Sequence, residues 1–153
     1  MHFYNLILEL SKKGKIELFI DMDGVISSYD FGKPLDFDKK RPLKSNIKVI
    51  EKVSKISNLD LYILSVCRTD NQIAEKMQWL DQNAPFFKKK SRIILSKEKF
   101  PNMTSAELKL NFFINYQNKG RMILVDDDNS VLSTIGKELK DKIILFQDSE
   151  LID

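Results

Sequence analysis

Short runs of apolar residues alternate along the chain with longer segments in which apolar residues recur every three or four positions. The short runs are typical of strands that are buried on both faces, as in the middle of a parallel sheet. The longer segments are typical of helices with one apolar face. The pattern predicts five strands, at residues 16–20, 59–66, 92–95, 121–125 and 142–146. It predicts five helices, at residues 3–12, 45–57, 70–82, 105–117 and 129–139.

The order of these elements predicts the fold class. After the first helix, strands and helices alternate to the end of the chain, which implies right-handed crossovers and a doubly wound, mostly parallel α/β sheet. The helix at 70–82 is expected to turn Ile73, Met77 and Leu80 toward the sheet. Residues 21–43 are rich in glycine, proline and polar residues and predict a loop or a small excursion. No repeat or linker-like tract divides the chain, so we expect one domain over residues 1–153.

The composition restricts the chemistry that the chain can perform. One cysteine, Cys67, and one histidine, His2, exclude an internal disulfide, a zinc site of several His and Cys ligands, and a Ser–His–Asp triad. A metal bound here would have oxygen ligands, which favours magnesium, manganese or calcium. The net charge of +3 is compatible with a phosphorylated or nucleic-acid partner. No apolar run approaches the roughly 20 residues of a membrane span, and no signal peptide is evident, so we expect a cytoplasmic protein without a membrane partner.

Acidic residues follow two of the predicted strands at the point where each strand ends. Asp21 and Asp23 follow the first strand, Asp126–Asp128 follow the fourth, and Ser65 lies at the end of the second. Each acid alone is also explained as a turn former or a helix cap. Ligands of open parallel sheets bind beyond the carboxyl ends of the strands, where these side chains would converge. Five carboxylates repel one another unless a cation lies among them, so the pattern favours Mg²⁺ and phosphoryl chemistry.

The same residues resemble the motifs of the haloacid dehalogenase (HAD) superfamily. The run FIDMDGV, with Asp21 and Asp23, resembles the first motif, and Ser65 in YILSV resembles the second. The run ILVDDD, with Asp126 and Asp127, resembles the fourth, acidic motif. The order fits the family, with 44 positions from Asp21 to Ser65 and 61 from Ser65 to Asp126. The resemblance covers nearly the whole chain and implies a HAD-like, Mg²⁺-dependent phosphatase domain.

The resemblance also implies a role for each of these side chains. Asp21 would be the nucleophile that forms an aspartyl-phosphate, and Asp23 would be the general acid and base. Ser65 would hydrogen-bond the transferring phosphoryl group. Mg²⁺ would bind the Asp21 carboxylate, the Asp23 backbone carbonyl and an acid of the Asp126/Asp127 pair.

The third motif of the family is a lysine, for which the sequence offers three positions. Lys109 lies early in the helix before the fourth predicted strand and resembles a common placement. Lys97 and Lys99 follow the third predicted strand and resemble the placement in deoxyribonucleotidases. Lys109 is favoured and Lys99 is the next choice.

The spacing leaves little sequence for a cap domain over the site. Only residues 25–44 are free between the first two motifs, and predicted elements fill the stretch between Ser65 and the fourth strand. We therefore expect no large cap and an open site with room for a large substrate, such as a protein or a nucleic-acid end. The segment EKMQWL at 75–80, followed by RIILSKEK, resembles 5'(3')-deoxyribonucleotidases, although those enzymes have a larger cap.

Other interpretations fit the sequence less well. Response-regulator receivers place their paired acids on the first strand, whereas the paired acids here come late. Toprim-type nuclease domains need a glutamate after an early strand, whereas Glu17 lies within the strand. The expected function is hydrolysis of a phosphate monoester: a nucleotide, a nucleic-acid end or another phosphate ester. A 5'-nucleotidase acting on (deoxy)ribonucleotides and a non-catalytic phosphate-binding or interaction protein on a HAD scaffold are the alternatives.

Overall fold

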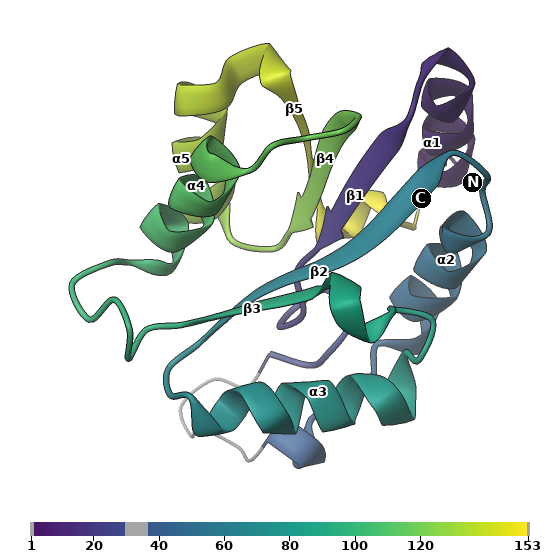
Figure 1. Ribbon diagram of the computed structural model, residues 1–153. Coiled ribbons are helices and arrows are strands. Elements are labelled where there is room, and N and C mark those ends of the chain that lie inside the picture. The colour runs from purple at the N-terminus through teal and green to yellow at the C-terminus, as the bar shows by residue number, and fades with distance from the viewer. Residues whose placement is uncertain (1, 30–36, 153) are drawn as a thin grey trace.

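A single five-stranded sheet forms the centre of the molecule (Figure 1). The computed structural model describes residues 2–29 and 37–152. All strand pairs are parallel, and the strand order is β3-β2-β1-β4-β5. The strands are β1 (Ile16–Ile20), β2 (Leu59–Cys67), β3 (Arg92–Ser96), β4 (Arg121–Asp126) and β5 (Ile143–Gln147). The helices are α1 (His2–Lys13), α2 (Lys44–Ser54), α3 (Asn71–Asn83), α4 (Ser105–Asn115) and α5 (Asn129–Leu139).

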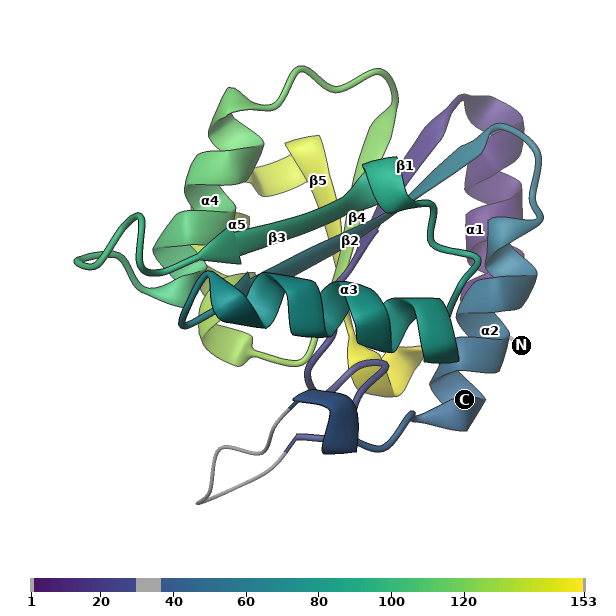
Figure 2. The ribbon, with the colours of Figure 1, turned by 60° about the horizontal axis from the view of Figure 1, so that its bottom comes forward.

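Helices cover both faces of this sheet, which confirms the predicted doubly wound α/β class. Helices α1, α2 and α3 pack on one face, and α4 and α5 pack on the other (Figures 1 and 2). Side chains of β1 alternate between the two layers because successive residues of a strand point to opposite faces. Leu18 and Ile20 belong to the first core and Phe19 to the second. Every residue of β1 is buried, as expected for the central strand of a parallel sheet.

The buried face of α3 differs from the sequence prediction. Ile73 and Met77 are only half-buried, whereas Lys76 and Trp79 are buried together with Leu80. Lys76 and Trp79 can both be buried because each finds polar partners in the interior. The Trp79 indole donates a hydrogen bond to the Lys40 carbonyl at 3.0 Å, and the Lys76 ammonium has three acceptors described below.

Glu17 is a fully buried carboxylate that ties the far end of α4 to β1. Its Oε1 accepts hydrogen bonds from the backbone N–H groups of Lys119, at 2.6 Å, and Gly120, at 3.1 Å. Its Oε2 accepts hydrogen bonds from the hydroxyls of Tyr62 and of Tyr116, the residue that follows α4. With both oxygens hydrogen-bonded, the buried carboxyl group has a structural role at the end of the sheet where β1 begins.

The segment between β1 and α2 forms no large cap, as expected. Its described parts, residues 21–29 and 37–43, are a loop and one short 3₁₀ turn, η1 (Phe37–Lys39), which packs against α3. In Figure 2 this turn lies below α3, next to the end of the sheet where β1 ends. Across the described residues, no helix combines the length and the apolar character that crossing a membrane requires.

Candidate functional site

Three carboxylates converge where β1 and β4 end side by side. Ile20 is paired with Val125, and the Asp21 N–H donates to the Val125 carbonyl at 3.0 Å, so Asp21 lies beside Asp126. Carboxylate oxygens of Asp21, Asp126 and Asp127 lie within 4.8 Å of one another. The parallel register of the two strands therefore brings residues 105 positions apart in the sequence to one point.

Lys109 supplies a positive charge inside this acidic cluster. Its Nζ lies 3.0 Å from Asp21 Oδ1 and 2.6 Å from Asp126 Oδ2, and the side chain is buried. Burial opposes the charged form, but the two carboxylates outweigh it and raise the pKa of Lys109. A capping box at Thr104 and Glu107 fixes the start of α4, so that Lys109 enters the cluster from the first turns of the helix.

The other two lysines considered from the sequence lie elsewhere. Lys97 and Lys99 belong to the connection between β3 and α4, and Lys99 is exposed. Within residues 2–29 and 37–152, neither forms an ion pair with the cluster of Asp21, Asp126 and Asp127. Lys109 is thus the lysine that the structure brings to the acids.

The cluster remains electrostatically unbalanced in spite of Lys109. Burial, followed by the charge of Asp21, raises the pKa of both Asp126 and Asp127, for Asp127 to about 8. Three carboxylates facing one ammonium form a set of hard oxygen donors that suits a divalent cation such as Mg²⁺. Asp128 has a different task, because its Oδ1 accepts a hydrogen bond from the Ser130 N–H and caps α5.

Gly24 makes room for one of these acids. Its φ is +83°, and a Cβ placed on it would lie 2.0 Å from Asp127 Oδ2. Any other residue would be strained by the backbone conformation and would displace the Asp127 carboxylate. The glycine of the DMDG turn is therefore required both by the turn itself and by the loop after β4.

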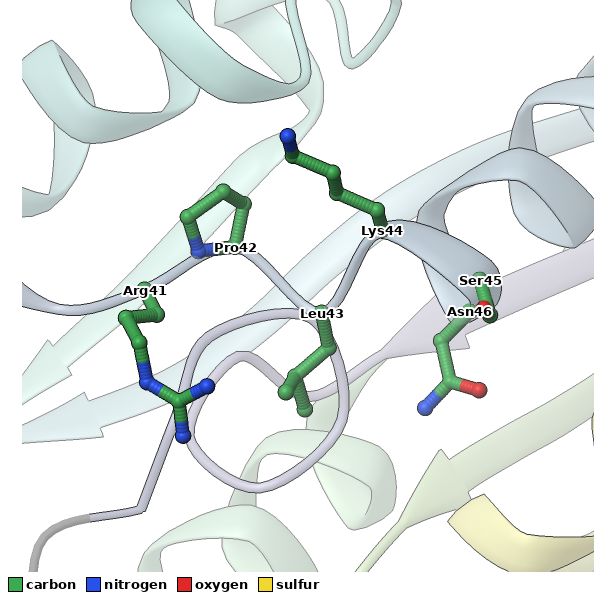
Figure 3. A pocket seen from close by; sticks show the side chains of 6 residues that line it. All are labelled: Arg41, Pro42, Leu43, Lys44, Ser45 and Asn46. Atoms are coloured by element: carbon green, nitrogen blue, oxygen red, sulfur yellow. The ribbon is translucent and has the colours of Figure 1, made fainter.

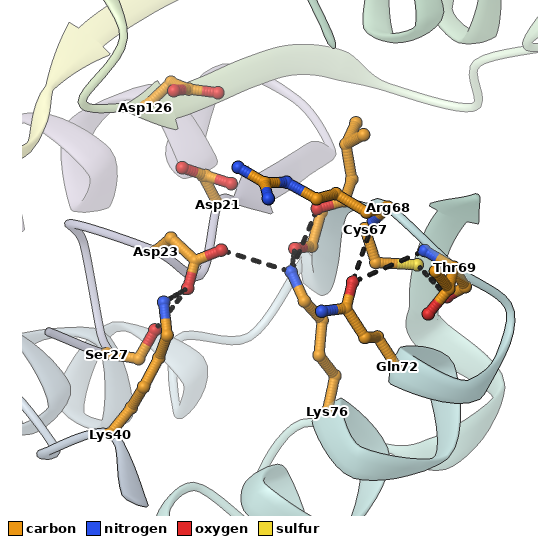
Figure 4. Close-up of polar contacts among 12 residues, drawn as sticks. Asp21, Asp23, Ser27, Lys40, Cys67, Arg68, Thr69, Gln72, Lys76 and Asp126 are labelled. Atoms are coloured by element: carbon orange, nitrogen blue, oxygen red, sulfur yellow. Dashed lines mark hydrogen bonds and ion pairs between the residues drawn. The ribbon is translucent and has the colours of Figure 1, made fainter. Parts of the chain in front are cut away.

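Asp23 lies on the same turn and is held by cationic side chains. Its Oδ1 accepts hydrogen bonds from Lys40 Nζ at 2.7 Å and Ser27 Oγ at 3.2 Å, and its Oδ2 accepts one from Lys76 Nζ at 3.3 Å (Figure 4). Burial favours the neutral acid, but the charges of Lys76 and Lys40 outweigh it and lower the pKa of Asp23. The carboxylate is thus fixed as an acceptor, and it lines the same pocket as Asp21.

Ser65 is joined to Asp23 through Lys76, a residue that the sequence analysis did not single out. Ser65 lies in β2 and is buried, and its Oγ accepts a hydrogen bond from Lys76 Nζ at 2.6 Å. Figure 4 shows the Lys76 side chain rising from α3 toward the end of β2. The available signal was its spacing, because Lys76 precedes Trp79 and Leu80 by three and four positions on a helix and so shares their face.

A pocket of about 790 Å³ opens over the acidic cluster and the turn after β1, and neither Ser65 nor Lys76 belongs to its lining. Asp21, Asp23, Asp127 and Lys109 contribute to its lining, and the ring of Tyr29, which is 56% exposed, lies at the same pocket. Its position beyond the carboxyl ends of the strands is where open α/β sheets bind their ligands.

A second pocket, of about 670 Å³, lies at the start of α2. Arg41 and Lys44 contribute to its lining, but in Figure 3 their charged groups point in different directions. The Asn46 side chain donates to the Val25 carbonyl at 2.8 Å, which fastens α2 to the loop after β1. This pocket therefore brings together no second set of reactive groups.

Comparison with known proteins identifies similar folds but no family. No protein-family model and no curated protein matches the chain. Chains in two solved structures of the Pnkp1/Rnl/Hen1 RNA repair complex share the fold, each with a TM-score of 0.66 over 88% of this chain. The sequence identities are 16% and 18%, so the likeness concerns the fold. This chain spans 43% and 46% of the chains that it resembles, which is less than half of their length.

Proposed function

We propose that this chain is a Mg²⁺-dependent phosphatase that hydrolyses a phosphate monoester through an aspartyl-phosphate on Asp21. The observation that carries the proposal is the meeting of Asp21, Asp126, Asp127 and Lys109 at the floor of an open pocket. A carboxylate attacks without first losing a proton, which suits a chain whose single histidine, His2, begins α1.

The first half of the reaction transfers the phosphoryl group to Asp21. Lys109 holds the Asp21 carboxylate through Oδ1 and offsets part of the surrounding negative charge. A carboxylate oxygen forms a bond to phosphorus as the bond from phosphorus to the ester oxygen breaks, and Asp23 gives its proton to that oxygen. Lys76 and Lys40 favour the ionised form of Asp23. A phosphate dianion bound beside it has the opposite effect, because like charges repel, and so favours the protonated form that this first half of the reaction needs.

The second half returns Asp21 to its free form. Asp23, now ionised and held by Lys40 and Lys76, takes a proton from water. The resulting nucleophile attacks phosphorus, and the bond between phosphorus and the Asp21 oxygen breaks to release inorganic phosphate. The lowered pKa of Asp23 suits this step, because the base must be ionised at neutral pH.

The oxygen donors at the site fit Mg²⁺, which prefers carboxylates and carbonyls and pairs with substrate phosphates. The Asp21 carboxylate, the Asp23 backbone carbonyl and an acid of the Asp126/Asp127 pair would hold the ion. When bound, Mg²⁺ supplies positive charge that stabilises the transferring phosphoryl group.

For the substrate we propose a phosphorylated nucleic-acid end. The lack of a large cap leaves the pocket open, and Tyr29, which is 56% exposed at this pocket, would be an aromatic contact for a base. The similar folds found in an RNA repair complex support the same class of substrate. A mononucleotide substrate is the second candidate, favoured by the same exposed ring.

Hydrolysis of p-nitrophenyl phosphate, with Mg²⁺ or with excess chelator, tests the proposed reaction. We expect activity only with Mg²⁺, and we expect Asp21→Asn to lose at least about 10³-fold in kcat while remaining folded. Asp141→Asn, at an exposed position after α5, is the matched control and should keep full activity. A folded Asp21→Asn variant with more than a few per cent of activity would exclude the covalent mechanism. A wild-type protein that binds phosphate without turnover would instead support the non-catalytic alternative.

Oligonucleotides carrying a 5'- or 3'-phosphate, compared with mononucleotides and glycerol phosphate, test the substrate. We expect the highest kcat/KM on one of the oligonucleotides. Tyr29→Ala should raise KM for that substrate about tenfold and leave glycerol phosphate unchanged, since glycerol offers no ring to stack. An equal effect on both substrates would remove Tyr29 from recognition.

A further inference from the structure

Lys76 is a buried cation whose contact with Ser65 has no task in the proposed reaction. Only 2% of the residue is exposed, and its ammonium lies in the interior between the end of β2 and the turn after β1. Its Nζ donates to Ser65 Oγ at 2.6 Å, to the Val66 carbonyl at 3.0 Å and to Asp23 Oδ2 at 3.3 Å. An ammonium has three N–H donors, so all three are engaged and none is left for a substrate.

The chemistry of the two groups fixes how the Ser65 hydroxyl is oriented. An ammonium donates and never accepts, so Ser65 Oγ is the acceptor in the bond to Lys76. Its hydroxyl hydrogen must therefore point away from Lys76. Among the residues that the structure describes, the Ser65 hydroxyl donates no hydrogen bond. A buried hydroxyl normally donates as well as accepts, so a donor held in this way is suited to an oxygen that arrives with a ligand.

We propose that Lys76 is a positioning residue that orients the Ser65 hydroxyl so that its hydrogen is donated to the transferring phosphoryl group. This inference rests on the proposed phosphatase function and adds a residue to the binding of its phosphoryl group. Ser65 itself is buried, but its neighbour Val66 lines the pocket over Asp21, so this end of β2 borders the pocket. Without Lys76, the hydroxyl would be free to rotate, and nothing would hold its hydrogen in one direction.

Ser65 depends on Lys76 more than Asp23 does. Asp23 keeps Lys40 and Ser27 as partners when Lys76 is removed, whereas in the described part of the chain Ser65 has only Lys76. The effect of removing Lys76 should therefore pass mainly through Ser65. That expectation separates a role in phosphoryl binding from a role in proton transfer.

A double-mutant cycle of Lys76→Met and Ser65→Ala tests the proposal. We expect Lys76→Met to lower kcat/KM about 10- to 100-fold, the usual effect of losing one hydrogen bond to a charged group. In the Ser65→Ala background, the same change should cost less than about threefold, because the hydroxyl that it orients is gone. The loss should be equal on p-nitrophenyl phosphate and glycerol phosphate. Lys12→Met, on the exposed face of α1, is the matched control and should behave as wild type.

Three outcomes overturn the proposal. Losses that multiply in the double variant would give Lys76 a general structural role. A larger loss on glycerol phosphate than on p-nitrophenyl phosphate would mean that Lys76 acts through Asp23, since only the alkyl leaving group needs a proton. Unchanged activity in Lys76→Met would remove the residue altogether. Where melting curves show that Lys76→Met is unfolded, Lys76→Gln, which retains an N–H donor, takes its place in the cycle and should retain part of the activity.

Binding of tungstate, an oxyanion of phosphate shape, separates this proposal from the proposed function. Calorimetry in Mg²⁺ should show tungstate binding to the wild type that weakens about tenfold in Lys76→Met and in Ser65→Ala, without further loss in the double variant. If the wild type hydrolyses no ester but shows this binding pattern, the phosphatase proposal fails and the orientation of Ser65 stands. If all four proteins bind tungstate equally, the orientation of Ser65 by Lys76 is wrong, whatever their activity.

Discussion

The contacts of Asp23 determine both its position and its ionisation. It is held by Lys40, Ser27 and Lys76, so its carboxylate position is set before a substrate arrives. On the proposed mechanism, the same carboxyl first gives and then takes a proton. The lysines lower its pKa, which favours its role as a base. Its role as an acid then requires the negative charge of the bound substrate, which favours the protonated form.

Asp23→Asn is expected to bind Mg²⁺ and tungstate nearly as well as the wild type, since the proposed metal contact uses the backbone carbonyl. Turnover of glycerol phosphate should fall by about 10²- to 10⁴-fold, the usual contribution of general acid–base catalysis. The loss on p-nitrophenyl phosphate should be smaller, because its leaving group needs no proton. Steady-state kinetics on both esters measure the difference. Equal losses on the two would assign Asp23 a structural role or make hydrolysis of the aspartyl-phosphate rate-limiting.

Single residues differ in how far the sequence predicts their place. Asp21, Asp126 and Asp127 were predictable because each directly follows an apolar strand or ends one, and the ends of parallel strands meet. Lys109 could be favoured over Lys97 and Lys99 only by resemblance. Lys76 was missed because a lysine on a helix is expected in solvent, and its burial depends on acceptors that lie 10, 11 and 53 positions away.

At the scale of elements, the turn after β1 and the loop after β4 are packed against each other. Gly24 is the point of contact, because the absence of a side chain leaves room for the Asp127 carboxylate. The strand positions were predictable to within one or two residues, since buried runs are short and sharply bounded. The orientation of α3 was not, because it depends on polar partners of Lys76 and Trp79 that are distant in the sequence.

Gly24→Ala is expected to lower kcat about 100-fold or more, because a Cβ 2.0 Å from Asp127 Oδ2 must displace that carboxylate. The positive φ adds strain, so the melting temperature should fall as well. Gly14→Ala is the matched control, since no atom lies within 4 Å of the Cβ that it adds. Activity and thermal melting of the two variants test the expectation, and a fully active Gly24→Ala protein would mean that Asp127 is dispensable.

At the scale of the whole molecule, the acidic cluster makes stability depend on pH and on Mg²⁺. Burial and the charge of Asp21 raise the pKa of Asp127 to about 8 and also raise that of Asp126. An unfolded aspartate has a pKa of about 3.9, so above that pH the folded protein binds more protons than the unfolded chain. Stability of the metal-free protein should therefore fall as the pH rises from about 4 to 8. The lowered pKa of Asp23 acts in the opposite direction, but only in the acidic range near and below its ordinary value.

Melting temperatures in excess chelator between pH 5 and pH 8 are expected to decrease with pH. Addition of Mg²⁺ should raise the melting temperature, and by more at pH 8 than at pH 5, because the ion relieves repulsion among ionised carboxylates. Asp127→Asn should flatten the pH dependence in chelator. A melting temperature that rises from pH 5 to pH 8 without metal would contradict the assignment of raised pKa values to these acids.

Helix α4 is fastened to β1 at two points, and this limits how its sequence can change. Lys109 contacts Asp21 at one end, and Tyr116 contacts Glu17 at the other. Glu17 and Asp21, which directly follows β1, are about 13 Å apart at the rise of a strand. Lys109 and Tyr116, which directly follows α4, are about 10 Å apart at the rise of a helix. One inserted residue would rotate everything beyond it by about 100°, so only one of the two contacts can survive. Substitutions at the exposed positions of this stretch, Asn111, Ile114 and Asn115, are therefore tolerable, whereas the number of residues there is fixed. A one-residue insertion or deletion in this stretch should break the contact of Lys109 or that of Tyr116, whereas the same change in the connection at 100–103 should leave both.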